Sequence, residues 1–197
     1  MEREQLIEAV RGQMPEKRWL HTLGVMETAV RLARQYGADE RKADLAAIMH
    51  DTAKYWEIGR LERMIHEAPN TDRYFHPDYV LRFDRQLLHA PVGAYVAETE
   101  YRIADPEVLD AIRYHTTGRE RMTLLDKVVC LADYMEPGRD FPGVQQIRAL
   151  AEQDLNSALI AGFDSTISFL LQKGKTVFPL TIMARNSLIE EDESRYE

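Results

Sequence analysis

The sequence predicts an all-α protein with a single domain. Its 197 residues suit one domain, and a hydrophobic content of 45% provides for a substantial core. Glycine and proline are few, at 10 and 8 residues, which argues against turn-rich all-β folds. Apolar residues recur at intervals of three and four, and no segment shows the clear alternation of a strand. A single all-α domain is therefore expected over residues 1–197.

The first three helices expected are short, long and intermediate in length. A short amphipathic helix ends near Gly12. Pro15 suits the first position of the long helix, which runs to a glycine cap at Gly37. Asp39 then caps a helix that extends to about Trp56.

The middle of the chain holds a shorter helix, an irregular segment and two further helices. The irregular segment covers residues 66–88, and the helix after it reaches about Arg102. Asp105 and Pro106 supply the N-cap and the first-turn proline of the next helix, which ends near Gly118.

The carboxyl-terminal part is helical up to an acidic end. Thr123 and Asp126 form a capping box for one helix, and apolar stripes predict one or two helices over 143–173 and a short one over 180–189. The expected parts of the domain are a core over about residues 15–140, C-terminal helices over about 143–190 and an acidic tail over 190–197.

Charge and cysteine content exclude several classes of function. The net charge of −8 provides no basic field for nucleic acid or an acidic membrane. No apolar run reaches the length of about 18 residues needed for a membrane helix. The single cysteine, Cys130, excludes an intrachain disulfide and a multi-cysteine zinc site. A reducing compartment, the cytoplasm, is the expected location.

Histidines and aspartates recur along the chain in an order that points to a metal site. Each lies on or at the end of a different expected helix, apart from the adjacent pair at 50 and 51, and small residues flank the first two histidines, which lets helices approach closely. A lone histidine on such a face is commonly a core residue, so the prediction of a metal site depends on the whole series of histidines and aspartates. The candidate ligands are His21, His50, Asp51, His89, His115 and Asp133.

These six side chains suit two transition-metal ions. Four imidazoles and two carboxylates without a thiolate fit iron, manganese, cobalt or zinc and are too rich in nitrogen for calcium. Asp51 can bridge one ion held with His21, His50 and Asp133 and a second held with His89 and His115. Neither octahedral shell is then complete, which favours catalysis. Two such ions can share a hydroxide that attacks a phosphoryl group, so a metal-dependent phosphohydrolase is expected.

The order H…HD…H…H…D resembles the HD-domain phosphohydrolase superfamily, whose fold is a helical bundle. Short motifs around these residues extend the resemblance to the YqeK family of bacterial symmetrical bis(5′-nucleosyl)-tetraphosphatases over about residues 15–185. The resemblance implies that diadenosine tetraphosphate is cleaved to two ADP at a dimetal centre containing iron. These family motifs are Arg18 to Val25, His50 to Lys54, Tyr114 to Arg119 and Asp133 to Val144.

Five further residues are candidates for contact with a nucleotide substrate. Lys54 lies at i+4 from His50 and i+3 from Asp51, which places it on the metal-facing side of a helix, where it contacts phosphate or is a solvated charge. Thr116 stands at a helix end, where it binds phosphate or caps the helix. Arg18, Arg119 and Arg139 lie in the family motifs, where they either clamp phosphates or are plain surface charges.

Several alternatives stay open at this point. A nucleotidase or cyclic-nucleotide phosphodiesterase would use the same fold, a diiron HD oxygenase could use the same ligands, and a non-catalytic metal-binding module is a further class. Aromatic residues within 74–79 either stack on a nucleobase or pack a lid. A homodimer is compatible with the sequence.

Overall fold

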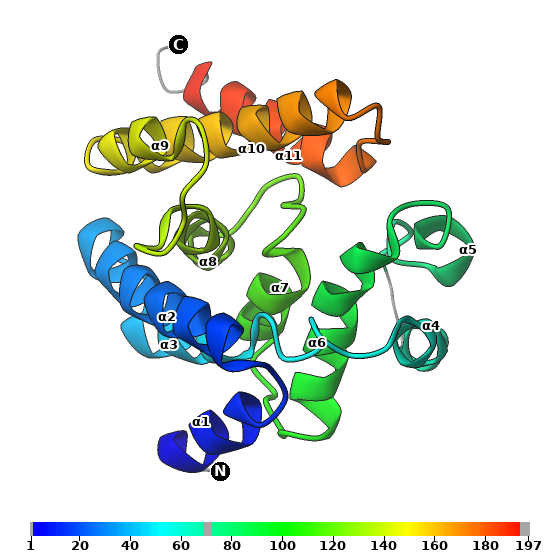
Figure 1. Ribbon diagram of the computed structural model, residues 1–197. Helices are drawn as coiled ribbons and strands as arrows, with labels where there is room; N and C mark the ends of the chain where they lie inside the picture. Colours follow the sequence, from blue (N-terminus) through cyan, green and yellow to red (C-terminus); the bar gives the residue numbers. More distant parts are fainter. Residues whose placement is uncertain (1, 69–71, 194–197) are drawn as a thin grey trace.

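Three helices at the amino-terminal end lie together on one side of a helical bundle (Figure 1). The computed structural model describes residues 2–68 and 72–193. Gly37 ends the second helix in the left-handed conformation, with φ of 82°, which glycine adopts without strain. Asp39 caps the third helix by accepting from two first-turn N–H groups. The helices are α1 (Arg3–Arg11), α2 (Glu16–Tyr36) and α3 (Glu40–Met49).

The third helix ends at Met49, so its predicted extension to Trp56 is wrong. The carbonyl oxygen of Ala47 is taken by Nδ1 of His50 at 2.6 Å, whereas a continued helix would use that oxygen for the next turn. Residues 50–55 instead form tight turns, with Lys54 N–H donating to Asp51 O at 2.9 Å. Because α3 ends at Met49, residues 50–55 lie beside the histidine cluster described below.

Six elements follow in the middle of the chain. The expected capping box of Thr123 and Asp126 is confirmed. The helix expected to end near Gly118 stops at Tyr114, and Gly118 adopts a positive φ of 64°. The elements are α4 (Ile58–Glu67), α5 (Pro77–Val80), the 3₁₀ helix η1 (Arg85–Leu88), α6 (His89–Thr99), α7 (Pro106–Tyr114) and α8 (Leu124–Met135).

Three C-terminal helices form a layer above α8 in Figure 1. They are α9 (Val144–Ala151), α10 (Leu155–Gln172) and α11 (Pro179–Glu193). Helix α11 continues through the first residues of the expected acidic tail, because Glu191 accepts from Lys127 and Asp192 accepts from Asn156. Residues 194–197 of that tail lie outside the described residues.

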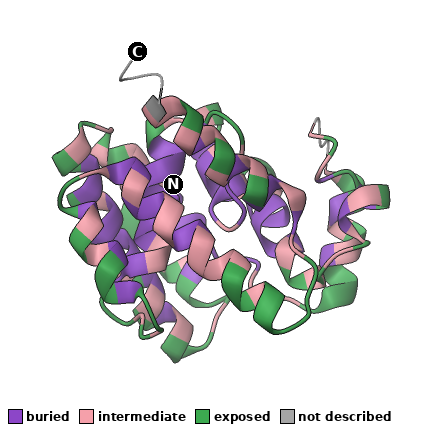
Figure 2. Cartoon of the chain, turned by 90° about the horizontal axis from the view of Figure 1, so that it is seen from above, coloured by how far each residue is buried: buried purple, intermediate pink, exposed green. Residues whose placement is uncertain are grey.

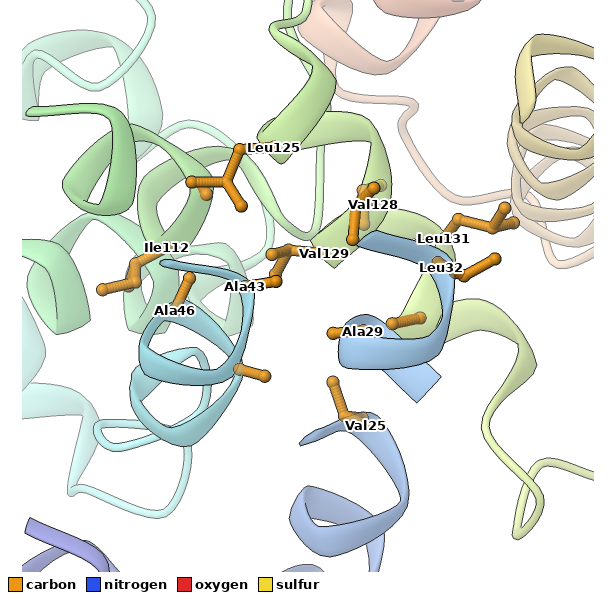
Figure 3. Packing of buried hydrophobic residues seen from close by; sticks show 14 of the residues in the cluster. Val25, Ala29, Leu32, Ala43, Ala46, Ile112, Leu125, Val128, Val129 and Leu131 are labelled. Carbon is orange, nitrogen blue, oxygen red and sulfur yellow. The ribbon is translucent and has the colours of Figure 1, made fainter. Parts of the chain in front are cut away.

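The larger of two hydrophobic clusters includes residues from Leu6 of α1 to Leu188 of α11. A second cluster packs α4, α5 and η1 against α6 through residues that include Leu61, Val80 and Leu88. Figure 3 shows Ala29 of α2, Ala43 of α3 and Val129 of α8 among the buried residues of the larger cluster. Small side chains at these positions let the helices approach closely, while Figure 2 shows exposed residues on the outer faces. The prediction of an all-α fold is confirmed, since no strand occurs among the described residues. None of the described helices combines the length and apolarity needed to span a membrane.

Candidate metal centre and cleft

Four histidines from four helices converge on one aspartate inside the bundle. His21 projects from the second turn of α2, His50 and His115 follow the ends of α3 and α7, and His89 begins α6. Asp51 follows His50 directly and is fully buried. The ring centroids of His50 and His115 are 5.0 Å apart, and those of His89 and His115 are 5.1 Å apart. Residues far apart in sequence thus form a single cluster.

The two oxygens of Asp51 face different pairs of histidines. Oδ2 lies 3.0 Å from Nε2 of His50 and 3.7 Å from Nε2 of His21. Oδ1 lies 3.3 Å from Nε2 of His89 and 3.8 Å from Nε2 of His115. Each oxygen completes a triad whose ligand atoms all lie within 4.8 Å of one another. A carboxylate in this position can bridge two cations.

The protonation and pairing of these atoms fit metal ligands. Burial lowers the pKa of His50 and of His89 well below the usual value and that of His115 to about 4, so these imidazoles are neutral near pH 7 and keep a lone pair for a metal. The buried atoms Nε2 of His21, Nε2 of His50 and Oδ1 of Asp51 have no hydrogen-bond partner among the described residues. Such atoms are costly to bury unless a cation is bound. The residues therefore fit a divalent metal centre.

Asp133 of α8 lies beside the cluster and is paired with an arginine. Its Oδ1 is 3.0 Å from Nε2 of His21. Arg139 bonds the carboxylate through Nη2 and donates from Nε to the Asp133 carbonyl at 2.6 Å. Burial alone would raise the pKa of Asp133, but Arg139 and the neighbouring histidines hold it well below its usual range. The carboxylate is thus ionised and available at the edge of the first triad.

Two more cations and a hydroxyl group lie against the cluster. Arg18 donates to Asp51 through Nη2, while its buried Nε has no partner among the described residues. Lys54 Nζ lies 3.4 Å from Nδ1 of His89, and burial together with nearby Arg18 lowers its pKa to about 8. Thr116 Oγ1 lies 2.9 Å from Nε2 of His115. The cluster therefore has a positive, hydrogen-bonding margin.

This margin opens into a cleft of about 1010 Å³ beneath α9 and α10. The cleft is large for a small-molecule site, for which about 300–1,000 Å³ is usual. Its end near the cluster is lined by Arg18, Lys54, His89, His115, Thr116, Asp133 and Arg139. The remainder is lined by aromatic, amide and hydroxyl side chains, including Phe141, Gln146, Ser165, Phe169 and Gln172.

Arg119 differs from the other sequence candidates, because the structure does not bring it to the cleft. Its Nε donates to Asp126 at 2.8 Å and its Nη1 to Asp110 at 2.9 Å, and its guanidinium carbon lies 4.7 Å from the ring centre of Tyr114. These partners tie the segment after α7 to the start of α8. The sequence alone does not separate these placements, because a helix-end arginine next to a site can point either toward a ligand or along the backbone.

We expect Arg119→Gln to lower the free energy of unfolding by roughly 3 kcal/mol while kcat of the folded enzyme stays within about twofold. This cost is at the lower end of that for removing one partner of a buried ion pair, since Asp126 keeps its bond from Thr123 N–H. Urea unfolding and steady-state kinetics check this. A large loss of kcat with unchanged stability would restore Arg119 to the site.

Two other groups of residues are placed by the structure rather than by the sequence pattern. The aromatic residues of 74–79 pack on Phe178, with Phe75 stacked at 5.9 Å between ring centres, and do not line the cleft.

Glu136 is buried, and its Oε1 lies 2.9 Å from Nδ1 of His21. In the sequence Glu136 lies within the family motif Asp133 to Val144, but nothing there marks it as a partner of His21; its burial beside that ring is the signal that the sequence lacks.

An all-helical bundle with this His/Asp cluster defines the class of HD-type hydrolases, and the comparisons agree. The model of the HD domain matches residues 18–138, which is more than half of the chain and contains all six candidate ligands. The chain therefore belongs to the HD domain family.

Relatives within this family are similar over nearly their full length. The "Bis(5'-nucleosyl)-tetraphosphatase, symmetrical" of Bacillus subtilis (strain 168) is 47% identical over 96% of this chain and 98% of its own. A protein of the same name from Halalkalibacterium halodurans is 46% identical over 97% and 99%. A Clostridium acetobutylicum crystal structure, described as a predicted HD superfamily hydrolase involved in NAD metabolism, has a TM-score of 0.88 and 39% identity over 97% of this chain and 98% of that one. The chain belongs to the same family as the two tetraphosphatases.

Proposed function

We propose that this protein is a symmetrical bis(5′-nucleosyl)-tetraphosphatase that hydrolyses diadenosine tetraphosphate to two ADP. The observation that carries the proposal is Asp51, whose two oxygens each complete a histidine triad beside three cations on the wall of a large cleft. Near-complete coverage of relatives with this printed name supports it. The cofactor proposed is a pair of transition-metal ions, with iron as the expected metal.

Each of the two groups of three ligands would hold one of the two ions. His21, His50 and Asp51 would hold one ion, with Asp133 beside them, and Asp51, His89 and His115 would hold the other. When bound, two such ions lower the pKa of water toward neutrality and neutralise charge on a phosphoryl group. The buried histidines stay neutral beside them because burial depresses their pKa values.

The polyphosphate lies along the cationic margin of the cleft. Arg18 offers a buried Nε donor that has no partner among the described residues, and Lys54 and Arg139 add positive charge to the same wall. Preorganised cations of this kind stabilise charge that develops on the phosphoryl group and on the departing diphosphate. Thr116 Oγ1 is placed to bond a phosphate oxygen next to His115.

The far end of the cleft suits a nucleoside. Phe169 of α10 lines the cleft and leaves 55% of its surface exposed, and Phe141 lines the same cleft. Aromatic rings of this kind stack on nucleobases, because every base offers a flat face. These rings support binding of a base beneath α10 while the phosphates lie at the metal cluster.

We expect diadenosine tetraphosphate to give two ADP and no AMP or ATP. ADP departs readily as an anion, so attack at one of the two inner phosphorus atoms needs little help from a strong general acid. Chromatography of the products after loading with Fe²⁺ or Mn²⁺ tests this. In ¹⁸O-water a single ADP of each pair should carry the label, and formation of AMP with ATP would contradict the proposal.

The same assay separates the rival functions. NAD⁺ is included because of the description of the Clostridium structure, and mononucleotides and cyclic nucleotides test the nucleotidase and phosphodiesterase alternatives. Oxygen consumption without phosphate transfer would favour an oxygenase. Two bound ions without turnover of any substrate would favour a metal-binding module.

A further inference from the structure

Three of the four clustered histidines are oriented by backbone carbonyl groups of their own helix ends. Nδ1 of His50 lies 2.6 Å from Ala47 O, and Nδ1 of His115 lies 2.7 Å from Ile112 O. Nδ1 of His89 contacts the carbonyl of residue 86 in the same way. Each of these histidines follows the end of a helical segment, where carbonyl groups lack an intrahelical partner. No side chain is needed to fix these three rings.

His21 cannot be oriented in this way because of its position. It lies within α2, which runs from Glu16 to Tyr36, and the carbonyl groups of a helix interior are taken by its own N–H groups. Its Nδ1 lies 2.9 Å from Oε1 of Glu136 instead. His21 is thus the histidine of the cluster whose ring depends on another side chain.

We propose that Glu136 is a positioning residue, which accepts the Nδ1 hydrogen of His21 and keeps Nε2 of that ring aimed at Asp51 and Asp133. Glu136 is 3% exposed, and its second oxygen accepts from Gly138 N–H at 2.5 Å. With both oxygens engaged as acceptors, the carboxylate is fixed. Outer partners of this type set the tautomer and ring orientation of metal-binding histidines.

Two glycines leave space for this carboxylate. A Cβ atom at Gly24 would lie 2.5 Å from Oε2 of Glu136, and one at Gly138 would lie 3.0 Å from both of its oxygens. Gly24 stands inside α2, where alanine is the better helix former. Because glycine weakens a helix interior, its presence one turn after His21 is explained by the approach of Glu136.

The loop that carries Glu136 is held from the other side by α9. Arg148 donates to the carbonyl oxygens of Met135, Glu136 and Arg139 at 3.0, 2.8 and 3.0 Å. One guanidinium therefore fixes the segment that presents both Glu136 to His21 and Arg139 to Asp133.

The inference rests on the proposed metal centre, and Mn²⁺ binding to the metal-free chain tests it. We expect Glu136→Gln to weaken one of two Mn²⁺ binding steps by about 10- to 100-fold, the usual effect of losing such an outer partner, and to leave the other step within about twofold. Glutamine has one acceptor where Glu136 uses two, so either His21 or Gly138 loses its partner. Isothermal titration with chelator competition measures both constants.

Gly24→Ala provides a second variant that retains Glu136 and displaces its carboxylate, and it should weaken the same step. Gly59→Ala is the matched control, because a Cβ there would lie 3.6 Å from the flexible end of Arg63; both constants should stay unchanged. Thermal unfolding of each metal-free variant measures stability separately.

The outcomes distinguish this inference from the metal centre itself. Unchanged constants in Glu136→Gln and Gly24→Ala, with two ions bound to the parent, would overturn the role of Glu136 alone. Equal weakening of both steps together with a lowered melting temperature would also overturn it, since Glu136 would then support the fold in general. Absence of Mn²⁺ binding to the parent would overturn both.

Discussion

Asp51→Ala is expected to release both metal ions and to lower turnover by at least about 10³-fold. Asp51 belongs to both histidine triads, so its loss removes one ligand from each ion. Lewis-acid stabilisation by bound ions is worth several kcal/mol, and each loss of about 1.36 kcal/mol is a tenfold loss of rate. Elemental analysis after gel filtration and kcat under saturating substrate measure the two effects.

Three comparison variants show whether the effect arises from bridging. His115→Ala removes a ligand from one triad only and should retain more metal than Asp51→Ala. Asp51→Asn keeps the shape of the side chain but lacks its charge, and should lose metal as Asp51→Ala does. Asp78→Ala removes an exposed carboxylate and should behave as the parent. Full and equal occupancy in Asp51→Ala and His115→Ala would contradict the bridging role.

The parts of the fold that could be predicted are those set by local physics. Caps at Asp39 and Thr123 satisfy the free N–H groups of a helix start within a few residues, so sequence spacing reveals them. Small residues such as Ala43 and Ala46 mark the close packing of α2, α3 and α8, which Figure 3 shows. The histidine order predicted one cluster, because each ligand lies on or beside a separate helix facing the same core.

The parts that could not be predicted depend on where single side chains point. The interval from His50 to Lys54 predicts a helical turn, whereas residues 50–55 form tight turns. A tight turn also brings residues three apart together, so Lys54 lies near Asp51 and still reaches His89. Arg119 and Arg139 both follow helices that carry site residues. The first is captured by Asp126 and the second by Asp133, and only tertiary packing decides between such partners.

Lys54→Met is expected to keep the fold and the metal ions but to lower kcat by about 10²- to 10³-fold. Lys54 lines the cleft with its ammonium group 3.4 Å from His89, and in the proposed function this positive charge lies beside the reacting phosphoryl group. Removing one preorganised electrostatic contact costs roughly 2.7–4 kcal/mol. An interaction made chiefly in the transition state affects kcat more than KM, so KM should change by no more than a few-fold.

The alternative interpretation of Lys54 is an ordinary surface charge, and the two interpretations predict different kinetics. Truncation of a solvated lysine changes stability by no more than about 0.5 kcal/mol and would leave turnover intact. Lys17→Met is the matched control, because Lys17 is exposed on α2; its kcat should stay within about twofold of the parent. Steady-state kinetics together with metal analysis of both variants decide the question. If Lys54→Met also stayed within twofold of the parent while binding two ions, Lys54 would have no part in the chemistry, and the charge on the phosphoryl group would have to be met by Arg18, Arg139 and the metal ions alone.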